Sequence, residues 1–158
     1  KEEQAYGIYR VRVAFMGNKH TGGKNLIYIL DALWSGADWN GYPVKFHMPP
    51  FDNHWNSSLF VSMDPVAIES VAFDFLRTEF SRPEHDIKYI YKPGTDDYLH
   101  QAADSGNRPE DLSYQPDGDG LYMADSLGVH EHWNDPIEKK YSRNKGLDEG
   151  IELINVHL

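Results

Sequence analysis

The chain has 158 residues and carries 15 basic against 25 acidic side chains, a formal net charge of −10 with histidine neutral. This length suits one domain with its own core, and the acidic balance argues against nucleic acid as a partner, because phosphate binding needs clustered Lys and Arg. Cys is absent, which excludes disulfides and a Cys nucleophile, and no apolar run reaches the ~20 residues of a membrane span.

The first third of the chain predicts two strands. Residues 8–15 alternate between apolar and polar positions, a pattern typical of a half-buried strand with one wet face. Residues 26–33 form a nearly unbroken apolar run around Asp31, which favours a buried central strand, with a short helix as the alternative. A Gly-rich connector joins the two segments.

Residues 34–57 are expected to form a long loop that contains Trp34, Trp39 and Trp55. A loop of this length in a compact domain is usually functional or covers another part of the molecule. Two interpretations of its rings remain open. Together with Trp133, rings such as Trp55 could line a pocket for a sugar or another flat ligand, or they could fix the loops to the core.

The clearest element follows a short strand at residues 58–62. Asp64 is a good N-cap and Pro65 suits the first helical position, so a helix is expected to run to about Phe80. Its apolar residues form one broad arc with a second, smaller edge, which predicts contact with two neighbours. Strand, turn and helix in this order predict an α/β fold, with a mixed or mostly parallel sheet, flanking helices and long aromatic-rich loops.

The second half of the chain is less regular. Thr95 can cap a short helix through Ala103, and residues 89–91, 129–133 and 151–156 are expected to be extended. Residues 117–120 form a strong turn signal that resembles the start of a calcium loop. The closing position, which needs a bidentate Glu, is Gly128, so an EF-hand is not expected.

His130-Glu131-His132 is the sharpest local motif. If the segment is extended, both imidazoles lie on one face with Cα atoms ~6.6 Å apart, because strands rise ~3.3 Å per residue. His130 and His132 could then share a divalent metal ion with a third ligand from elsewhere. Glu131 would point to the opposite face and would be a poor ligand. The alternative is a polar loop in which these side chains satisfy backbone groups.

Four further residues are candidates for a site. Asp31, in its apolar run, is either a catalytic acid near the end of a central strand or an anchor for a neighbouring loop. His20 and Lys24 flank the glycines of the connector, where they could take part in catalysis or cradle an anion, although a plain turn is the simpler interpretation. Asp64 is primarily a helix cap and could also contact a polar ligand.

The chain resembles the bacterial family called domain of unknown function 362. The segments that carry the resemblance are His20–Lys24, Leu30–Asp31, Pro49–Phe51, Trp55–Phe60, Asp64–Val71, Asp97–Ala103, Ser126–Asn134 and Tyr141–Asn144. Together they span nearly the whole chain. The Asp-Pro-Val-Ala segment marks the broad family, and Leu-Gly-Val-His-Glu-His-Trp-Asn marks a branch common in exported proteins of Bacteroidetes-like bacteria.

The resemblance implies that residues 1–158 are a single domain that forms the C-terminal part of a larger one and packs against an N-terminal remainder. It also implies a periplasmic or extracellular location. Some relatives carry ferredoxin-like clusters, but a chain without Cys contributes no ligand to an iron–sulfur cluster. The family is largely uncharacterised, so no catalytic residue carries over.

Three functions are therefore considered. The preferred one is an exported enzyme that acts on a small molecule or glycan, with Asp31 as acid or base and His130 and His132 as metal ligands or proton shuttles. The second is a non-catalytic module that binds carbohydrate or another ligand. The third is a structural segment that completes a larger domain.

Overall fold

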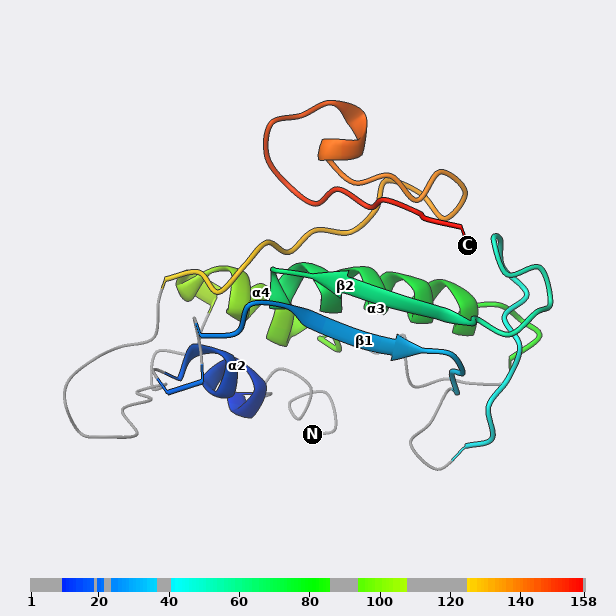
Figure 1. Cartoon of the computed structure of the whole chain (residues 1–158), viewed down its shortest axis with the longest axis horizontal. Helices are drawn as coiled ribbons and strands as arrows, with labels where there is room; N and C mark the ends of the chain where they lie inside the picture. The colour runs from blue at the N-terminus through cyan, green and yellow to red at the C-terminus, as the bar shows by residue number, and fades with distance from the viewer. Residues whose placement is uncertain are drawn as a thin grey trace.

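The computed structural model describes residues 10–18, 20–21, 24–36, 41–85, 94–107 and 125–157. The elements are helix α2 (Arg10–Gly17), strands β1 (Tyr28–Ala32) and β2 (Ser58–Ser62), helices α3 (Pro65–Phe80) and α4 (Asp97–Ala103), and the 3-10 turns η1 (Ser105–Asn107) and η2 (Arg143–Lys145). The two strands lie over α3, and the C-terminal segment lies on the side of α3 away from α2 (Figure 1). Within these ranges, no helix is both long and apolar enough to cross a membrane.

The sheet consists of β1 and β2, which pair antiparallel with Asp31 opposite Leu59. The short strand predicted at residues 58–62 is confirmed, and so is the mixture of helix and strand. A mostly parallel sheet is not what the described residues form, because their one strand pair runs antiparallel.

Strand β1 is not the buried central strand that its apolar run suggested. Its residues alternate in exposure, so that Ile29 is 65% exposed while Ala32 is buried. Asp31 is exposed as well, on the same face as Ile29. The prediction failed because apolar residues occupy both faces of the strand. The alternation between exposed and less exposed positions is therefore not visible in the sequence.

The strand expected at residues 8–15 is also wrong, because Arg10–Gly17 is helix α2. Val13 is fully buried in a cluster with Tyr98 and Leu99 of α4. A period-two pattern of eight residues is a weak signal, and tertiary packing against α4 overrides the strand preference of the valines.

Helix α3 forms as the sequence predicts. The Asp64 carboxylate accepts hydrogen bonds from the backbone N–H groups of Val66 and Ala67, at 2.8 and 2.9 Å, and Pro65 begins the helix. One face contributes Phe75 to the main core, and Val66 packs in the smaller core with α2 and α4. The expected contact with two neighbours is therefore confirmed.

The long loop at residues 34–57 contributes to the core rather than only covering it. Phe46, Met48 and Phe51 are buried there beside residues of α3, and an isolated bridge joins Phe46 to His54. Trp133 is buried in the same core, at 8% exposure, so its ring fixes a loop. Trp34 and Trp55 are more exposed, and Trp39 lies outside the described residues.

The C-terminal segment is held by side chains rather than by strands. Residues 129–133 and 151–156 do not form strands, contrary to the prediction. Instead Glu131 accepts hydrogen bonds from the backbone N–H groups of Ser142 and Ile151, at 3.0 and 2.7 Å, and closes this segment on itself. Gly150 is required there, because its φ is +102° and a Cβ atom would lie 2.6 Å from that of Ser142. The predictions for residues 89–91 and 117–120 fall outside the described residues.

Candidate metal site

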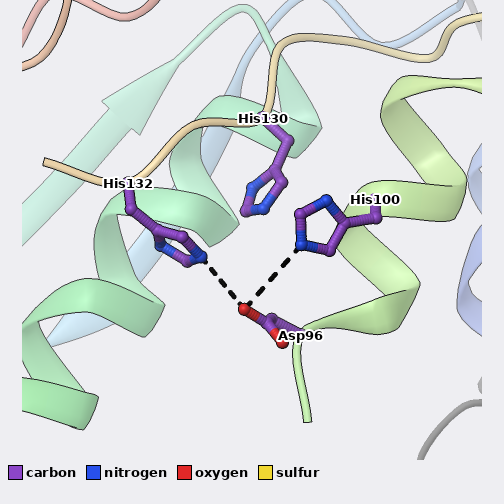
Figure 2. A group of neighbouring side chains, drawn as sticks. All are labelled: Asp96, His100, His130 and His132. Carbon is purple, nitrogen blue, oxygen red and sulfur yellow. Dashed lines mark hydrogen bonds and ion pairs between the residues drawn. The ribbon is translucent and has the colours of Figure 1, made fainter. Parts of the chain in front are cut away.

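Four side chains converge between α4 and the segment that precedes the C-terminal loop. Asp96, His100, His130 and His132 each offer one ligand atom, and these atoms all lie within 4.8 Å of one another. We call this group the Asp–His cluster. Asp96 is the N-cap residue of α4 and His100 lies within that helix, while His130 and His132 extend toward them from one chain segment (Figure 2).

The segment that carries the two histidines is held in place by two hydrogen bonds just before His130. The Val129 N–H donates to Asp64 at 2.8 Å, and the Leu127 N–H donates to the carbonyl of Ala102 at the end of α4, at 2.9 Å. Gly128 lets the chain pass so close to Asp64 that a Cβ atom would lie 2.0 Å from its carboxylate. The predicted N-cap therefore has a second role, which is to position His130.

The hydrogen-bonding pattern fixes the tautomer of His130. The Ser70 hydroxyl lies 2.7 Å from the carbonyl of Val66 and must donate its only proton to it. The contact of 2.8 Å between Ser70 Oγ and His130 Nδ1 is therefore a bond donated by Nδ1–H. Nε2 keeps its lone pair, is buried, and has no hydrogen-bond partner. Burial, with the neighbouring histidines His100 and His132, lowers the pKa of His130 to about 4, so the ring is neutral at pH 7.

His132 is held by a buried carboxylate. Its Nδ1 lies 2.6 Å from Asp74 Oδ1, and its Nε2 lies 3.0 Å from Asp96 Oδ2. The hydrogen bond to Asp74 raises the pKa of His132, against the opposing effect of burial. In the absence of an ion, His132 can donate to both carboxylates as an imidazolium. When an ion replaces the Nε2 proton, Asp74 and His132 form the carboxylate–histidine–metal arrangement common in metalloproteins.

Asp74 is a fully buried anion with several donors. Its Oδ2 accepts from the Trp133 N–H at 2.9 Å and from the Tyr141 hydroxyl at 3.0 Å. Burial and the adjacent carboxylate raise the pKa of Tyr141 well above its usual value, so Tyr141 remains a donor. This network stabilises the charge of Asp74 and fixes the orientation of the His132 ring.

Of the other two members of the cluster, His100 is exposed to solvent, whereas the Asp96 side chain is partly buried, at 19% exposure. The side chain of His100 is 49% exposed, and its Nε2 lies 4.0 Å from Asp96 Oδ2. Burial would raise the pKa of Asp96, but hydrogen bonds from its own backbone N–H and from His132 outweigh this effect and lower it. Asp96 stands at the N-cap of α4, yet its side chain makes no capping bond and turns to His132 instead. An ion at this position would be reachable from solvent.

The donor set suits a divalent transition ion. Three imidazole nitrogens and one carboxylate oxygen are ligands of Zn²⁺, and imidazole also suits copper, nickel and iron. Zinc bonds of ~2.0–2.1 Å in a tetrahedron place ligand atoms roughly 3.3 Å apart. The present separations, up to 4.8 Å, are wider, so the ligands would contract around an ion.

The other predicted site residues lie elsewhere. Asp31 is exposed, and its carboxylate accepts from the N–H of Leu33 at 2.9 Å, which matches the loop-anchor interpretation. His20 and Lys24 are both exposed in the connector. Neither Asp31 nor His20 belongs to a group of three or more metal-ligating side chains in the part of the chain that the structure describes. Asp31 and His20 therefore do not join His130 in the Asp–His cluster.

The sequence interpretation paired His130 with His132 but missed their partners. Asp96 and His100 lie four residues apart across the start of a short helix, a spacing that places two side chains on one face. This signal was available. Ser70 and Asp74 have the same spacing on α3, but their burial could be found only from the structure, because polar residues opposite an apolar arc normally face water.

Comparison with protein-family models, with curated proteins and with solved structures found no match. The geometry of the described residues is therefore the basis for the function proposed below.

Proposed function

We propose that the protein binds a divalent transition-metal ion at the Asp–His cluster and uses it in an enzymatic reaction on a small molecule or glycan. His130, His132 and Asp96 form the inner side of the site, and His100 lies on its solvent side, where water or substrate would take its place on the ion. Such an ion supplies Lewis acidity and lowers the pKa of a bound water, which suits hydrolysis.

The observation that carries this proposal is the free Nε2 atom of His130. A buried polar atom without a hydrogen bond costs about 1–3 kcal/mol, so native proteins rarely leave one unpaired. Here the hydroxyl of Ser70 occupies Nδ1 and directs the Nε2 lone pair toward three other potential ligands. An ion bound by Nε2 would remove the cost of leaving that atom unpaired.

The accessibility of the cluster favours a catalytic over a purely structural ion. Structural zinc sites are closed and usually contain Cys, whereas catalytic sites keep a position open to water. The chain has no Cys, and His100 and His132 are 49% and 28% exposed at their side chains. Both properties agree with an ion that exchanges a ligand with solvent.

The direct test is metal analysis of protein purified without chelators, followed by titration of the metal-free protein with Zn²⁺ and Co²⁺. One ion per chain is expected, with a cobalt spectrum of low coordination number. His130→Ala with His132→Ala should abolish this binding, while His54→Ala, which changes an exposed histidine outside the cluster, should leave it intact. A wild-type protein that binds neither ion would refute the proposal.

The cellular location and the family of the protein also belong to this proposal. The resemblance to domain of unknown function 362 supports a periplasmic or extracellular enzyme that includes an N-terminal remainder. It also supports packing of that remainder against the outer face of β1 and β2. That face exposes Ile29, Leu59 and Val61, at 65%, 62% and 57%. If such polypeptide exists, its co-expression with this chain should protect the amides of β1 from hydrogen exchange, and unchanged exchange would argue against packing on this face.

A further inference from the structure

The side chain of Arg77 lies beside the Asp–His cluster without a hydrogen bond to it. Its guanidinium nitrogens are 3.7 Å from Asp74 Oδ1 and 3.7 Å from Asp96 Oδ2. These distances are ion-pair contacts, but they exceed hydrogen-bond length. The side chain is 38% exposed, so the donor groups of the guanidinium remain accessible. Arg77 therefore lies at the edge of the proposed metal site, where its guanidinium N–H groups could donate hydrogen bonds to a ligand.

The position of Arg77 follows from the helix that carries it. Ser70, Asp74 and Arg77 are spaced by four and three residues, so α3 presents all three along one face. The guanidinium lies 5.3 Å from the ring centre of Phe73, a cation–π contact that limits its movement. The Phe73 ring in turn lies 6.0 Å from that of His132. The same helix therefore orients one metal ligand and places a cation next to it.

The charges at the site favour an anionic ligand. Histidines that bind a metal are neutral, so the two positive charges of the ion and the one of Arg77 outweigh the carboxylates of Asp74 and Asp96 by one. With the ion bound, the site would carry this local positive excess within a chain whose formal net charge is −10. One negative charge on a bound ligand would neutralise it.

We propose that Arg77 and the metal ion together bind an oxyanion of the substrate, either a carboxylate or a phosphate group. One oxygen would coordinate the ion and another would accept from Arg77, whose planar fork matches both kinds of anion. This inference rests on the metal site proposed above and narrows its substrate class to acidic small molecules or acidic sugars.

The test uses the full chain loaded with Co²⁺, whose visible spectrum reports a change of ligand. Methyl phosphate and acetate are titrated separately. Wild-type protein should show a saturable spectral shift with at least one of them, and the anion that binds more tightly assigns the class. Arg77→Met should retain one Co²⁺ per chain and lose about tenfold or more in anion affinity, since hydrogen bonds to charged groups contribute ~1.5–3 kcal/mol. Arg77→Lys should recover only part of the affinity, because it keeps the charge and loses the fork.

A matched control is Arg143→Met, which removes an exposed arginine from η2, outside the cluster, and should leave anion affinity unchanged. The inference is overturned if Arg77→Met binds both anions as tightly as wild type, or if neither anion alters the spectrum of cobalt-loaded protein. Failure of wild-type protein to take up Co²⁺ is a different result, because it overturns the metal site and the inference together.

Discussion

Two groups of side chains among the described residues contain the same kinds of ligand, imidazole and carboxylate, but differ in their hydrogen bonding. The Asp–His cluster lies at α4, and the second group, His47, Glu79 and His85, lies at the C-terminal end of α3; we call it the Glu79 cluster. In each, the potential ligand atoms lie within 4.8 Å of one another. A search by residue type and distance would not distinguish them.

The Glu79 cluster has its bonding capacity already filled. Glu79 is fully buried, and its two oxygens accept from the backbone N–H groups of His47 and Met48, at 2.8 and 2.9 Å. Oε1 also contacts His85 Nε2 at 2.6 Å and His47 Nδ1 at 3.1 Å. The carboxylate thus fixes the loop of Phe46 and Met48 onto α3, where both residues join the main core.

The Asp–His cluster differs in where its hydrogen bonds are made. Ser70 and Asp74 contact the Nδ1 atoms of His130 and His132 from outside, so both Nε2 atoms face inward, and that of His130 has no partner. The comparison indicates that residue types alone do not make a metal site. Hydrogen bonds to the Nδ1 atoms orient the histidines and leave their Nε2 atoms available to an ion. It also leads to predictions that should separate the two clusters.

The largest effect is expected from Glu79→Gln. An amide nitrogen would face donors that now bind a buried carboxylate, so the free energy of unfolding should fall by about 3–5 kcal/mol, the usual cost of breaking a buried charged pair. Urea denaturation measures this loss. Zinc stoichiometry of the fraction that remains folded should not change. Loss of zinc binding from folded Glu79→Gln protein would show that the two clusters are not independent.

His130→Ala should have the next largest effect, on metal affinity rather than on folding. Removal of an inner ligand should lower zinc affinity by more than the about 10–100-fold typical of an outer hydrogen-bond partner. Competition with a chromogenic chelator gives the affinity. His47→Ala is the matched control, because it removes one histidine from the Glu79 cluster and should leave zinc affinity as in wild type. Equal losses in both variants would contradict the distinction drawn here.

The contrast between the clusters also shows what the sequence could reveal. Asp64, Pro65 and the apolar arc define α3 locally, so its bounds could be predicted, and the pairing of His130 with His132 follows from their spacing. The burial of Asp74 could not be predicted, because it depends on Trp133 and Tyr141 arriving from about sixty residues away.

The exposure of Asp31 could not be predicted either, because it also depends on tertiary contacts. Asp31 stands in an apolar run, and only the pairing of β1 with β2 shows that this position lies on the open face of the sheet. Local signals therefore predicted α3 with its cap and a motif of two ligands, but they placed the cap of α4 at Thr95 instead of Asp96 and predicted a strand where α2 forms. The polar groups that complete the site come from tertiary contacts, which one sequence does not encode in any short window.

Asp74→Asn should lower zinc affinity by about 10–100-fold, as expected for loss of a carboxylate behind a ligating histidine. The substitution keeps the shape of the side chain but removes the charge that favours metal-bound His132. Because Asp74 is fully buried, this variant can also lose stability, so Ser70→Ala provides a second measurement at His130. If both variants fold and bind zinc as wild type does, the outer hydrogen bonds are irrelevant to binding.

The smallest effect is a pH dependence that belongs to the Glu79 cluster alone. Burial would raise the pKa of Glu79, but bonds from the backbone of His47 and Met48 and from the side chains of His85 and His47 outweigh it and lower that pKa. A carboxyl with a lower pKa in the folded state stabilises the protein above its unfolded-state pKa, and this contribution is lost as pH falls through the folded-state value.

The difference in unfolding free energy between wild type and Glu79→Gln should therefore shrink when metal-free protein is taken from pH 5 to pH 3. Denaturation at each pH measures this difference, in which acid effects common to both proteins, including those at Asp96, cancel. The groups facing Glu79, His47 and His85, are retained in both proteins. A difference that stays constant over this range would mean that the charge of Glu79 does not hold the loop of Phe46 and Met48, and that shape and hydrogen bonding alone do so.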